Sequence, residues 1–283
     1  MVLRGSCLRH IERNVVTTTT DQANAEFWNE LCGSNLAQTL GITDRSKRSL
    51  ERFDRAYLDY YPYLLRHVRP SELAGCRVLE IGLGYGALGQ KIAEAGADYV
   101  GLDIAEVPVR MMGHRLRLQG LGGFAVRGSA LSLPFPPESI DVLLSIGCFH
   151  HTGNVEQALD ETYRVLRPGG RAVLMVYNQF SYRQWFRWPA RTFHALLRDI
   201  GLPLGGVAVN EAQRRAYDSL ACGQPAPEIA FLSIAQLRRM LRHFPRVEFF
   251  KENNTICLRI PREWLLPSLG RWLGLDIYIR AQK

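Results

Sequence analysis

The spacing of apolar side chains changes once along the chain. Before Pro70, large apolar residues recur every three or four positions, as Leu50, Phe53 and Tyr57 illustrate. This spacing places side chains on one face of a helix. From residue 77 onwards, short apolar runs alternate with helical patterns. The sequence therefore predicts helices at the N-terminus, followed by alternating strands and helices.

Five strands and the helices that join them are predicted between residues 77 and 178. The predicted strands are RVLEIG (77–82), YVGLDI (99–104), FAVRG (124–128), SIDVLLSIG (139–147) and RAVLMVYN (171–178). The predicted helices cover 86–96, 107–119 and 155–170, and a Pro-Gly-Gly sequence ends the last one. Such alternation is typical of βαβ units in a parallel sheet, with ligands at the carboxyl ends of the strands.

A further helix (233–244) and two strands (246–253 and 275–283) are predicted near the C-terminus. We therefore expect an α/β, Rossmann-like fold: a seven-stranded, mostly parallel sheet with helices on both faces. A helical N-terminal cap and a cap inserted after the fifth strand complete it. The expected divisions are an N-terminal cap or lid (1–70), a nucleotide-binding core (71–178), an inserted substrate cap (179–232) and a C-terminal part of the sheet (233–283).

Composition and charge narrow the function classes. The chain has 283 residues, 47% of them hydrophobic, and a net charge of +8 that comes mostly from scattered arginines. Without a contiguous basic run, this charge gives no footprint for nucleic acid. No apolar run is long enough for a membrane helix, and the first residues lack a signal-peptide core, so we expect a cytoplasmic protein. Six scattered cysteines without a Cys-x-x-Cys pair predict reduced thiols and no metal site.

The stretch VLEIGLGYGALGQ (78–90) predicts a nucleotide-binding turn. Gly82, Gly84 and Gly86 let the backbone approach a ligand, and a dinucleotide-binding frame also fits the stretch. Glu80 precedes the first of these glycines and would oppose a pyrophosphate, whereas it suits the ammonium group of S-adenosylmethionine. Asp103 ends the second strand and suits ribose hydroxyls of either nucleotide.

Two further stretches indicate a family. GSALSLPFPPESIDVLLSIGCFHHTGN (128–154) and RVLRPGGRAVL (164–174), together with the glycine-rich turn, resemble the class I S-adenosylmethionine-dependent methyltransferases, in particular the small-molecule "methyltransferase type 11" group. The resemblance covers residues 77–178. A nicotinamide- or flavin-dependent dehydrogenase is the alternative interpretation of the glycines.

The resemblance implies a set of cofactor contacts. Glu80, Gly82, Gly84 and Gly86 would contact the methionine part, and Asp103 and Ile104 the ribose and adenine. Gly128, Ser129 and Ala130 match a turn near the adenine amino group, and Ser145 and Ile146 match the strand end beneath the sulfonium. Many relatives have Asp at the position of Ser129, so we expect a weaker or backbone hydrogen bond there.

Methyl transfer depends mainly on alignment of acceptor, methyl group and sulfur, so a general base is needed only where the acceptor must lose a proton. His150 and His151 are the candidates, with His151 preferred; packing or helix capping is the alternative role for both. The residues expected to contact the acceptor lie before the first strand and after the fifth. They are Tyr57, Tyr61, Asn178, Tyr182, Arg183 and Trp185.

The segment after the fifth strand is aromatic and rich in arginine. Arg183, Arg187 and Arg191 are expected on one helical face, with Pro189 kinking or interrupting the helix. This segment predicts either a second lid over an anionic or aromatic acceptor, or a basic solvated face. A third interpretation of this segment is that it contacts an anionic membrane surface.

The sequence thus predicts a methyltransferase that moves a methyl group to an O or N atom of a small molecule in a biosynthetic pathway, and releases S-adenosylhomocysteine. An RNA or protein methyltransferase and a catalytically silent S-adenosylmethionine-binding protein are the alternatives. We expect no nucleic-acid partner and no metal, and either a monomer or a homodimer.

Overall fold

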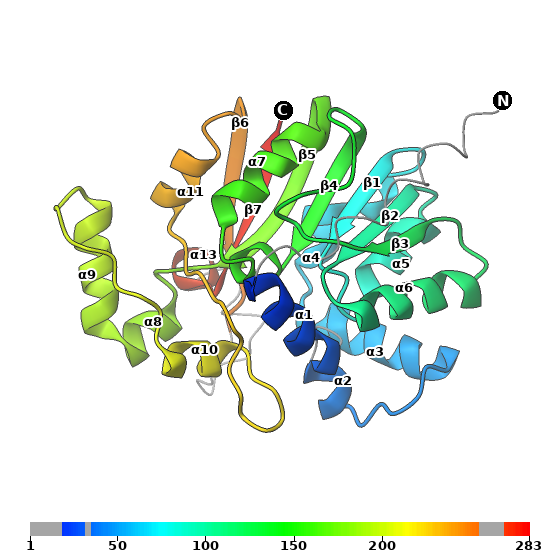
Figure 1. Ribbon diagram of the computed structural model, residues 1–283, viewed down its shortest axis with the longest axis horizontal. Helices are drawn as coiled ribbons and strands as arrows, with labels where there is room; N and C mark the ends of the chain where they lie inside the picture. The colour runs from blue at the N-terminus through cyan, green and yellow to red at the C-terminus, as the bar shows by residue number, and fades with distance from the viewer. Residues whose placement is uncertain (1–18, 32–34, 255–268) are drawn as a thin grey trace.

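A seven-stranded sheet forms the centre of the computed structural model, which describes residues 19–31, 35–254 and 269–283. Its strand order is β3-β2-β1-β4-β5-β7-β6 (Figure 1). The strands are β1 (Arg77–Ile81), β2 (Asp98–Asp103), β3 (Phe124–Arg127), β4 (Ile140–Ile146), β5 (Leu166–Tyr177), β6 (Arg246–Glu252) and β7 (Asp276–Gln282). β1 to β5 pair in parallel, and β7 runs antiparallel between β5 and β6. The predicted mostly parallel sheet is confirmed.

Helices precede the sheet, cross between its strands and follow β5. They are α1 (Thr19–Leu31), α2 (Asn35–Thr39), α3 (Lys47–Tyr60), α4 (Leu64–Val68), α5 (Ala87–Glu94), α6 (Glu106–Leu118), α7 (Val155–Val165), α8 (Tyr182–Arg187), α9 (Pro189–Asp199), α10 (Glu211–Tyr217), α11 (Ile234–Met240) and α13 (Leu269–Leu273). Two short 3₁₀ turns, η2 (Pro70–Glu72) and η3 (Phe149–His151), complete the elements. Within the described ranges no helix is both long and apolar enough to cross a lipid bilayer.

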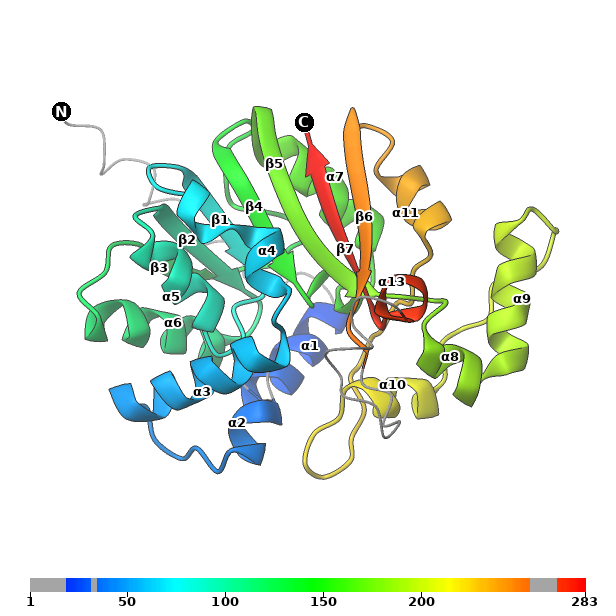
Figure 2. The ribbon, with the colours of Figure 1, turned by 180° about the vertical axis from the view of Figure 1, so that it is seen from behind.

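The two faces of the sheet carry separate apolar cores. Neighbouring strand residues point to opposite faces, so each buried strand supplies both cores. On one face Leu79, Leu143 and Leu174 pack with residues of α7 and α11. On the other face Val78 and Val173 pack with residues of α4, α5 and α6. Figures 1 and 2, which view the sheet from opposite sides, show these two helical layers and confirm helices on both faces.

The N-terminal helices and the segment that follows β5 meet at the carboxyl edge of the sheet. Phe27 of α1 packs in one cluster with Leu220, Ile229 and Phe231, which lie between α10 and α11. Figure 1 shows α1, α2, α3 and α10 together on this side of the sheet. The chain therefore closes the end at which parallel sheets bind ligands from two distant segments.

Three predicted details are wrong. α7 ends at Val165, not at residue 170, because Leu166 is extended (ψ 133°) and pairs with Ile140; Pro168 also disfavours helix just before it. α11 covers 234–240 only. The arginines do not share one helical face, since α8 and α9 are separate helices on either side of Trp188. The predicted interruption at Pro189 is confirmed.

The expected divisions at 1–70, 71–178, 179–232 and 233–283 remain predictions. Residues 1–18 and 32–34 of the first division, and 255–268 of the last, lie outside the described residues.

Candidate functional site

The loop after β1 is a tight bend built on three glycines. Gly82, Gly84 and Gly86 have φ values of 83°, 51° and 80°, in the region that residues with a Cβ rarely adopt. A Cβ on Gly82 would also lie 2.5 Å from the Cβ of Cys148, which follows β4. The bend therefore depends on glycine for its conformation, and at Gly82 also for space.

Asp103 ties this loop to the end of β2. Its carboxylate accepts hydrogen bonds from the backbone N–H of Leu83 (2.8 Å) and of Ala105 (2.9 Å). Burial raises the pKa of Asp103 to about 6, although the backbone hydrogen bonds oppose that shift. The acidic side chain predicted from the sequence thus joins two strand ends and borders the space above them.

Glu80 lies beneath the same loop. The Tyr99 hydroxyl donates to Glu80 Oε2 (2.5 Å), and burial raises the pKa of this carboxyl to about 8. Gly89 makes room for the pair, because a Cβ there would lie 2.5 Å from that oxygen. The third glycine of the dinucleotide-like frame therefore accommodates a carboxyl group.

A cavity of about 110 Å³ lies above these groups, and we call it the glycine-loop cavity. Its lining includes most of the predicted cofactor contacts: Gly82, Gly84, Asp103, Ile104, Gly128, Ser129, Ala130 and Ile146. Among the residues that the structure describes, the lining contains two acidic side chains, Asp21 and Asp103, and neither lysine nor arginine. A pyrophosphate would meet negative charge there without a compensating cation, which disfavours the dinucleotide alternative.

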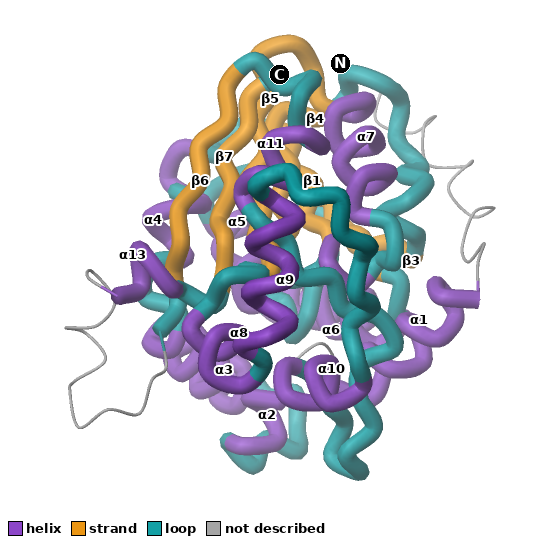
Figure 3. Tube along the Cα trace, turned by 90° about the vertical axis from the view of Figure 1, so that its left-hand side faces the viewer, coloured by secondary structure: helices purple, strands orange, loops and turns teal. Residues whose placement is uncertain are grey.

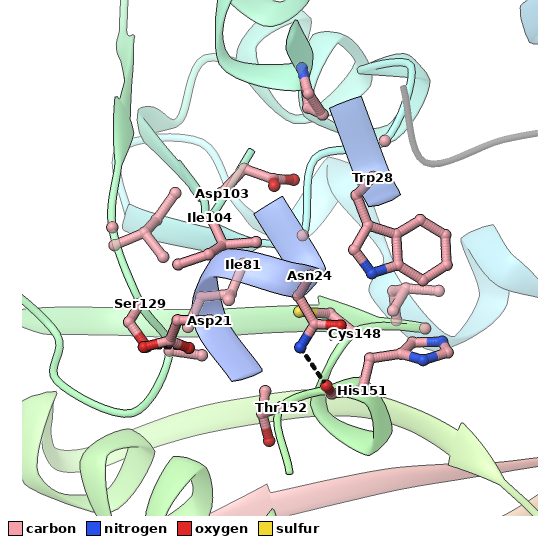
Figure 4. Close-up of a pocket in the computed structure, with 18 residues that line it drawn as sticks. Asp21, Asn24, Trp28, Ile81, Asp103, Ile104, Ser129, Cys148, His151 and Thr152 are labelled. Atoms are coloured by element: carbon pink, nitrogen blue, oxygen red, sulfur yellow. Dashed lines mark hydrogen bonds between the residues drawn. The ribbon is translucent and has the colours of Figure 1, made fainter. Parts of the chain in front are cut away.

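One side of the glycine-loop cavity is α1, which the sequence analysis did not connect with the site. Asp21, Asn24 and Trp28 line the cavity from this helix (Figure 4). Asn24 donates to the backbone oxygen of His151 (2.7 Å), and the Trp28 and His151 rings lie 4.7 Å apart. The spacing of three and four residues between these side chains was a readable signal, since it places them on one helical face.

Asp21 also changes the expectation for Ser129. The Ser129 hydroxyl donates to Asp21 Oδ1 (3.3 Å), so α1 brings a carboxylate to the turn where many relatives carry Asp. Figure 4 shows the two side chains facing each other at the cavity wall.

A second, larger cavity of about 500 Å³ adjoins the first, and we call it the tyrosine cavity. Both cavities are lined by Trp28, Gly82, Gly84, Ile146, Gly147 and His151. Seven tyrosines of the described residues line the tyrosine cavity: Tyr57, Tyr60, Tyr61, Tyr85, Tyr177, Tyr217 and Tyr278. Gly86 and Glu80 lie at its border with the glycine loop. The two cavities therefore meet beside His151.

The ring of His151 is held in one tautomer. Its Nδ1 lies 2.7 Å from the carbonyl oxygen of Glu228, which can only accept, so Nδ1 carries the proton. Nε2 is then free to accept a proton, and it lies 3.7 Å from Asp218 Oδ2. Burial lowers the pKa of His151, whereas Asp218 opposes that shift. This arrangement is a neutral imidazole with a carboxylate ready to stabilise its protonated form.

His150 differs from its neighbour. It lines neither cavity, and within the described residues its two ring nitrogens have no hydrogen-bond partner. Its ring packs 4.0 Å from that of Tyr177, and burial lowers its pKa well below the usual value. The geometry gives His150 the packing role that the sequence left open.

Two carboxyl groups of the tyrosine cavity were missed in the sequence. Asp218 follows α10 and accepts from the Tyr177 hydroxyl (2.9 Å). Asp276 begins β7, accepts from the Asn253 amide (3.0 Å), and has its pKa raised to about 7 by burial. Neither belongs to a local motif, so only the folded chain brings them together.

The predicted acceptor residues separate into two groups. Tyr57, Tyr61 and Arg183 line the tyrosine cavity, and the Arg183 guanidinium carbon lies 4.7 Å from the Tyr217 ring centroid. The others line neither cavity: Asn178, Tyr182 and Trp185.

Asn178 and Trp185 have structural partners instead. The Asn178 amide donates to the Gly274 carbonyl (2.7 Å) and accepts from the backbone of Phe180 (3.0 Å), while Trp185 stacks on the Phe180 ring. Ser145, expected beneath the sulfonium, is fully buried and also lines neither cavity. Cys148 lines the glycine-loop cavity, and burial raises the pKa of its thiol to about 12, so the thiol stays protonated.

Comparison with known proteins identifies the family of the chain. The family described as "methyltransferase domain" matches residues 79–174. An uncharacterized methyltransferase of Geobacillus kaustophilus is 34% identical over 54% of this chain and 73% of its own length. Phthiotriol/phenolphthiotriol dimycocerosates methyltransferase 1 of Mycobacterium ulcerans is 37% identical over 47% of this chain, and the match spans only 45% of that enzyme.

The fold has solved counterparts. The crystal structure of an S-adenosylmethionine-dependent methyltransferase from Mesorhizobium loti matches 75% of this chain and 93% of its own, with a TM-score of 0.50 and 22% identity. Together with the sheet order and the glycine loop, these matches identify the family. The chain belongs to the class I S-adenosylmethionine-dependent methyltransferases, a family whose cofactor is S-adenosyl-L-methionine.

Proposed function

We propose that the chain transfers a methyl group from S-adenosylmethionine to an O or N atom of a small molecule bound in the tyrosine cavity. When bound, the cofactor supplies the methyl group on a sulfonium that drives the transfer. The observation that carries the proposal is the junction of the two cavities at His151. A side chain able to accept a proton thus lies between the space for the cofactor and the space for an acceptor.

The residues that would hold the cofactor fit it in charge. Asp103 and Ile104 would hold the ribose and adenine, and Asp21 with Ser129 would accept from the adenine amino group. Glu80 would face the ammonium end, beside the glycine loop. Burial raises the pKa of Glu80 and therefore favours its neutral form. A cationic group of the ligand beside this carboxyl would favour the ionised form instead.

His151 is the proposed general base. Its Nε2 would take a proton from the acceptor as the new bond to the methyl carbon forms, and Asp218 would stabilise the resulting imidazolium. Tyr177 holds that carboxylate through its hydroxyl. Trp28 and the tyrosines around the cavity would exclude water and orient the acceptor.

The charges of the tyrosine cavity favour an acceptor with hydroxyl or amine groups. Beyond Glu80, the described residues that line it include two carboxyl groups, Asp218 and Asp276, and one permanent cation, Arg183. An anionic acceptor would be repelled by this balance, whereas hydroxyl and ammonium groups donate to carboxylates. The sequence predicted an anionic or aromatic acceptor. The tyrosines favour an aromatic acceptor, whereas the carboxyl groups of the cavity disfavour an anionic one.

The test is release of S-adenosylhomocysteine with a panel of phenols, alcohols, sugars, amines, carboxylates and lipids. We expect turnover among hydroxyl- or amine-bearing acceptors, and none with carboxylates. Turnover with RNA or a protein alone would contradict the small-molecule proposal. Binding of S-adenosylmethionine in calorimetry without turnover of any acceptor would favour the catalytically silent alternative, and absence of binding would contradict the proposed methyl transfer.

A further inference from the structure

Helices α8 and α9 form an arm, in which α8 packs on α10 through the buried Gln184 and α9 extends outwards from α8 (Figure 1). Figures 1 and 2 show α9 at the outer edge of the ribbon, and Figure 3 shows the pair from its outer side. Five of the eight large apolar side chains that are exposed in the described residues belong to this arm or to the chain just after it. They are Phe186, Phe193, Ile200, Leu202 and Val207, and we call them the arm patch.

α9 buries small side chains and exposes large ones. Its fully buried residues are Thr192 and Ala195, whereas Phe193 is 53% exposed and Ile200, at its end, is 67% exposed. Phe193 and Ile200 are seven residues apart and therefore lie on the same side of the helix. A helix that packs only within its own domain turns its large apolar face to the core. The reversed arrangement on α9 indicates that its exposed apolar face binds another apolar surface.

Positive charge is interspersed with the arm patch. Arg187 is exposed beside Phe186, and Arg191 and Arg198 follow on α9, where Asp199 is the acidic residue. Arg191 donates to the backbone oxygen of Ala208 and keeps its charge near the surface. Exposed apolar side chains among arginines are typical of helices that lie in the interface of an anionic membrane.

The arm also connects to the proposed acceptor site. Arg183, in the first turn of α8, lines the tyrosine cavity and donates to the backbone oxygen of Ala216 (3.2 Å). The arm patch begins with Phe186, one turn further along the same helix. A surface bound by the arm would therefore lie close to the elements that wall the tyrosine cavity.

We propose that α8 and α9 dock the chain on an anionic lipid surface through the arm patch and its arginines. The acceptor is then an amphiphile that enters the tyrosine cavity from that surface, and this second statement rests on the proposed methyl transfer.

Flotation of the full chain with lipid vesicles tests the docking. We expect binding to vesicles of phosphatidylcholine with phosphatidylglycerol, and a loss of about a hundredfold in the partition coefficient for the double variant F193S/I200S, about tenfold for each buried side chain removed. Both side chains are exposed, so the variant keeps its fold, which thermal unfolding checks. The matched control is Leu118→Ser, an exposed apolar residue on α6 outside the arm. It should bind like the wild type.

The charge is tested separately. Arg187→Glu should weaken binding to the anionic vesicles about tenfold and leave the weaker binding to pure phosphatidylcholine unchanged. Failure of the wild type to float with either vesicle, or equal flotation of F193S/I200S, would overturn the docking. Sedimentation that shows the patch pairing two copies of the chain, without flotation, would assign the face to self-association instead and equally overturn it.

The two proposals fail in different ways. Docking is measured without cofactor or turnover, whereas methyl transfer is measured with water-soluble acceptors and by cofactor calorimetry. For the amphiphile, we expect turnover of a long-chain alcohol or amine to rise on anionic vesicles in the wild type and not in F193S/I200S. Equal turnover in the two proteins would contradict that part.

Discussion

The two cavities are built in different ways, although they share a wall. Most of the glycine-loop cavity comes from the ends of the four strands β1 to β4 and the loops that follow them, between residues 81 and 152, with α1 added. The tyrosine cavity combines residues from Trp28 to Tyr278, contributed by both caps and by the antiparallel end of the sheet. The first therefore depends on local motifs, and the second on how distant segments fold together.

The difference has a functional meaning. Fold fixes the cofactor end, because a parallel sheet presents its strand ends and first loops in a constant arrangement. The acceptor end is free to vary, because specificity resides in sites added to a fold. Substitutions in the glycine-loop cavity should thus change the affinity for the cofactor and leave the choice of acceptor unchanged. Substitutions in the tyrosine cavity should change the choice of acceptor and leave the affinity for the cofactor unchanged.

The largest effect is expected from His151→Gln. Loss of a general base lowers kcat by about 10²- to 10⁴-fold for an acceptor that must lose a proton, while cofactor affinity changes little. Steady-state kinetics with a hydroxyl acceptor, together with calorimetry of S-adenosylmethionine, measure the two quantities.

The matched control is His150→Phe, which keeps an aromatic ring against Tyr177. Its kcat should stay within about fivefold of the wild type, since His150 lines neither cavity. Equal losses in the two variants would mean that both histidines act through packing, and would remove His151 from the mechanism.

Asp103→Asn should act on the other cavity. The substitution removes the charge and puts an amide N–H against one of the two backbone donors, Leu83 or Ala105. We expect S-adenosylmethionine to bind about 10 to 100 times more weakly, with the KM of the acceptor unchanged. A change in the KM of the acceptor, with the affinity for S-adenosylmethionine unchanged, would contradict the proposed division of roles between the two cavities.

A smaller effect is expected from Asp218→Asn. Asp218 raises the pKa of His151, so its loss lowers that pKa further. His151 must be neutral to accept a proton, and the acid limb of the kcat/KM profile should therefore move to lower pH. The kcat should fall by about tenfold or less, because the imidazolium loses its carboxylate partner. An unshifted pH profile with the same loss would indicate a purely structural role.

The sequence predicted the sheet well because its signals are local. Apolar runs such as 139–147 alternate with helical patterns, and the first four strands each carry a residue of the glycine-loop cavity at or just after their carboxyl ends. Errors arose where one residue decides a boundary, as at Leu166, which continues into β5 rather than extending α7. Spacing alone predicted Arg183, Arg187 and Arg191 on one helical face. The break between α8 and α9 instead places Arg191 in a different helix from the other two.

The candidate site was predictable only in part. The glycines, Glu80 and Asp103 stand in one motif, whereas Asp218 and Asp276 carry no local signal and reach the tyrosine cavity through the fold. Asn178 and Trp185 were plausible from their place after the fifth strand, but hydrogen bonds and stacking turn them to structural roles. α1 was readable as a helix, and its function appears only once its position over the strand ends is known.

The central claim is that a buried carboxyl beside the glycine loop receives a cationic ligand. Because the pKa of Glu80 is raised to about 8, this group is protonated below that pH and must lose its proton when an ammonium group binds. Affinity for S-adenosylmethionine should therefore rise about tenfold per pH unit between pH 6 and 7, where the ammonium of the ligand is still protonated.

Titration calorimetry at pH 6.5, in two buffers of different ionisation enthalpy, tests this claim most directly. The account predicts release of about one proton per S-adenosylmethionine bound to the wild type, and none for Glu80→Gln. Binding heats that do not depend on the buffer in the wild type, or tighter binding of NADH than of S-adenosylmethionine, would contradict it.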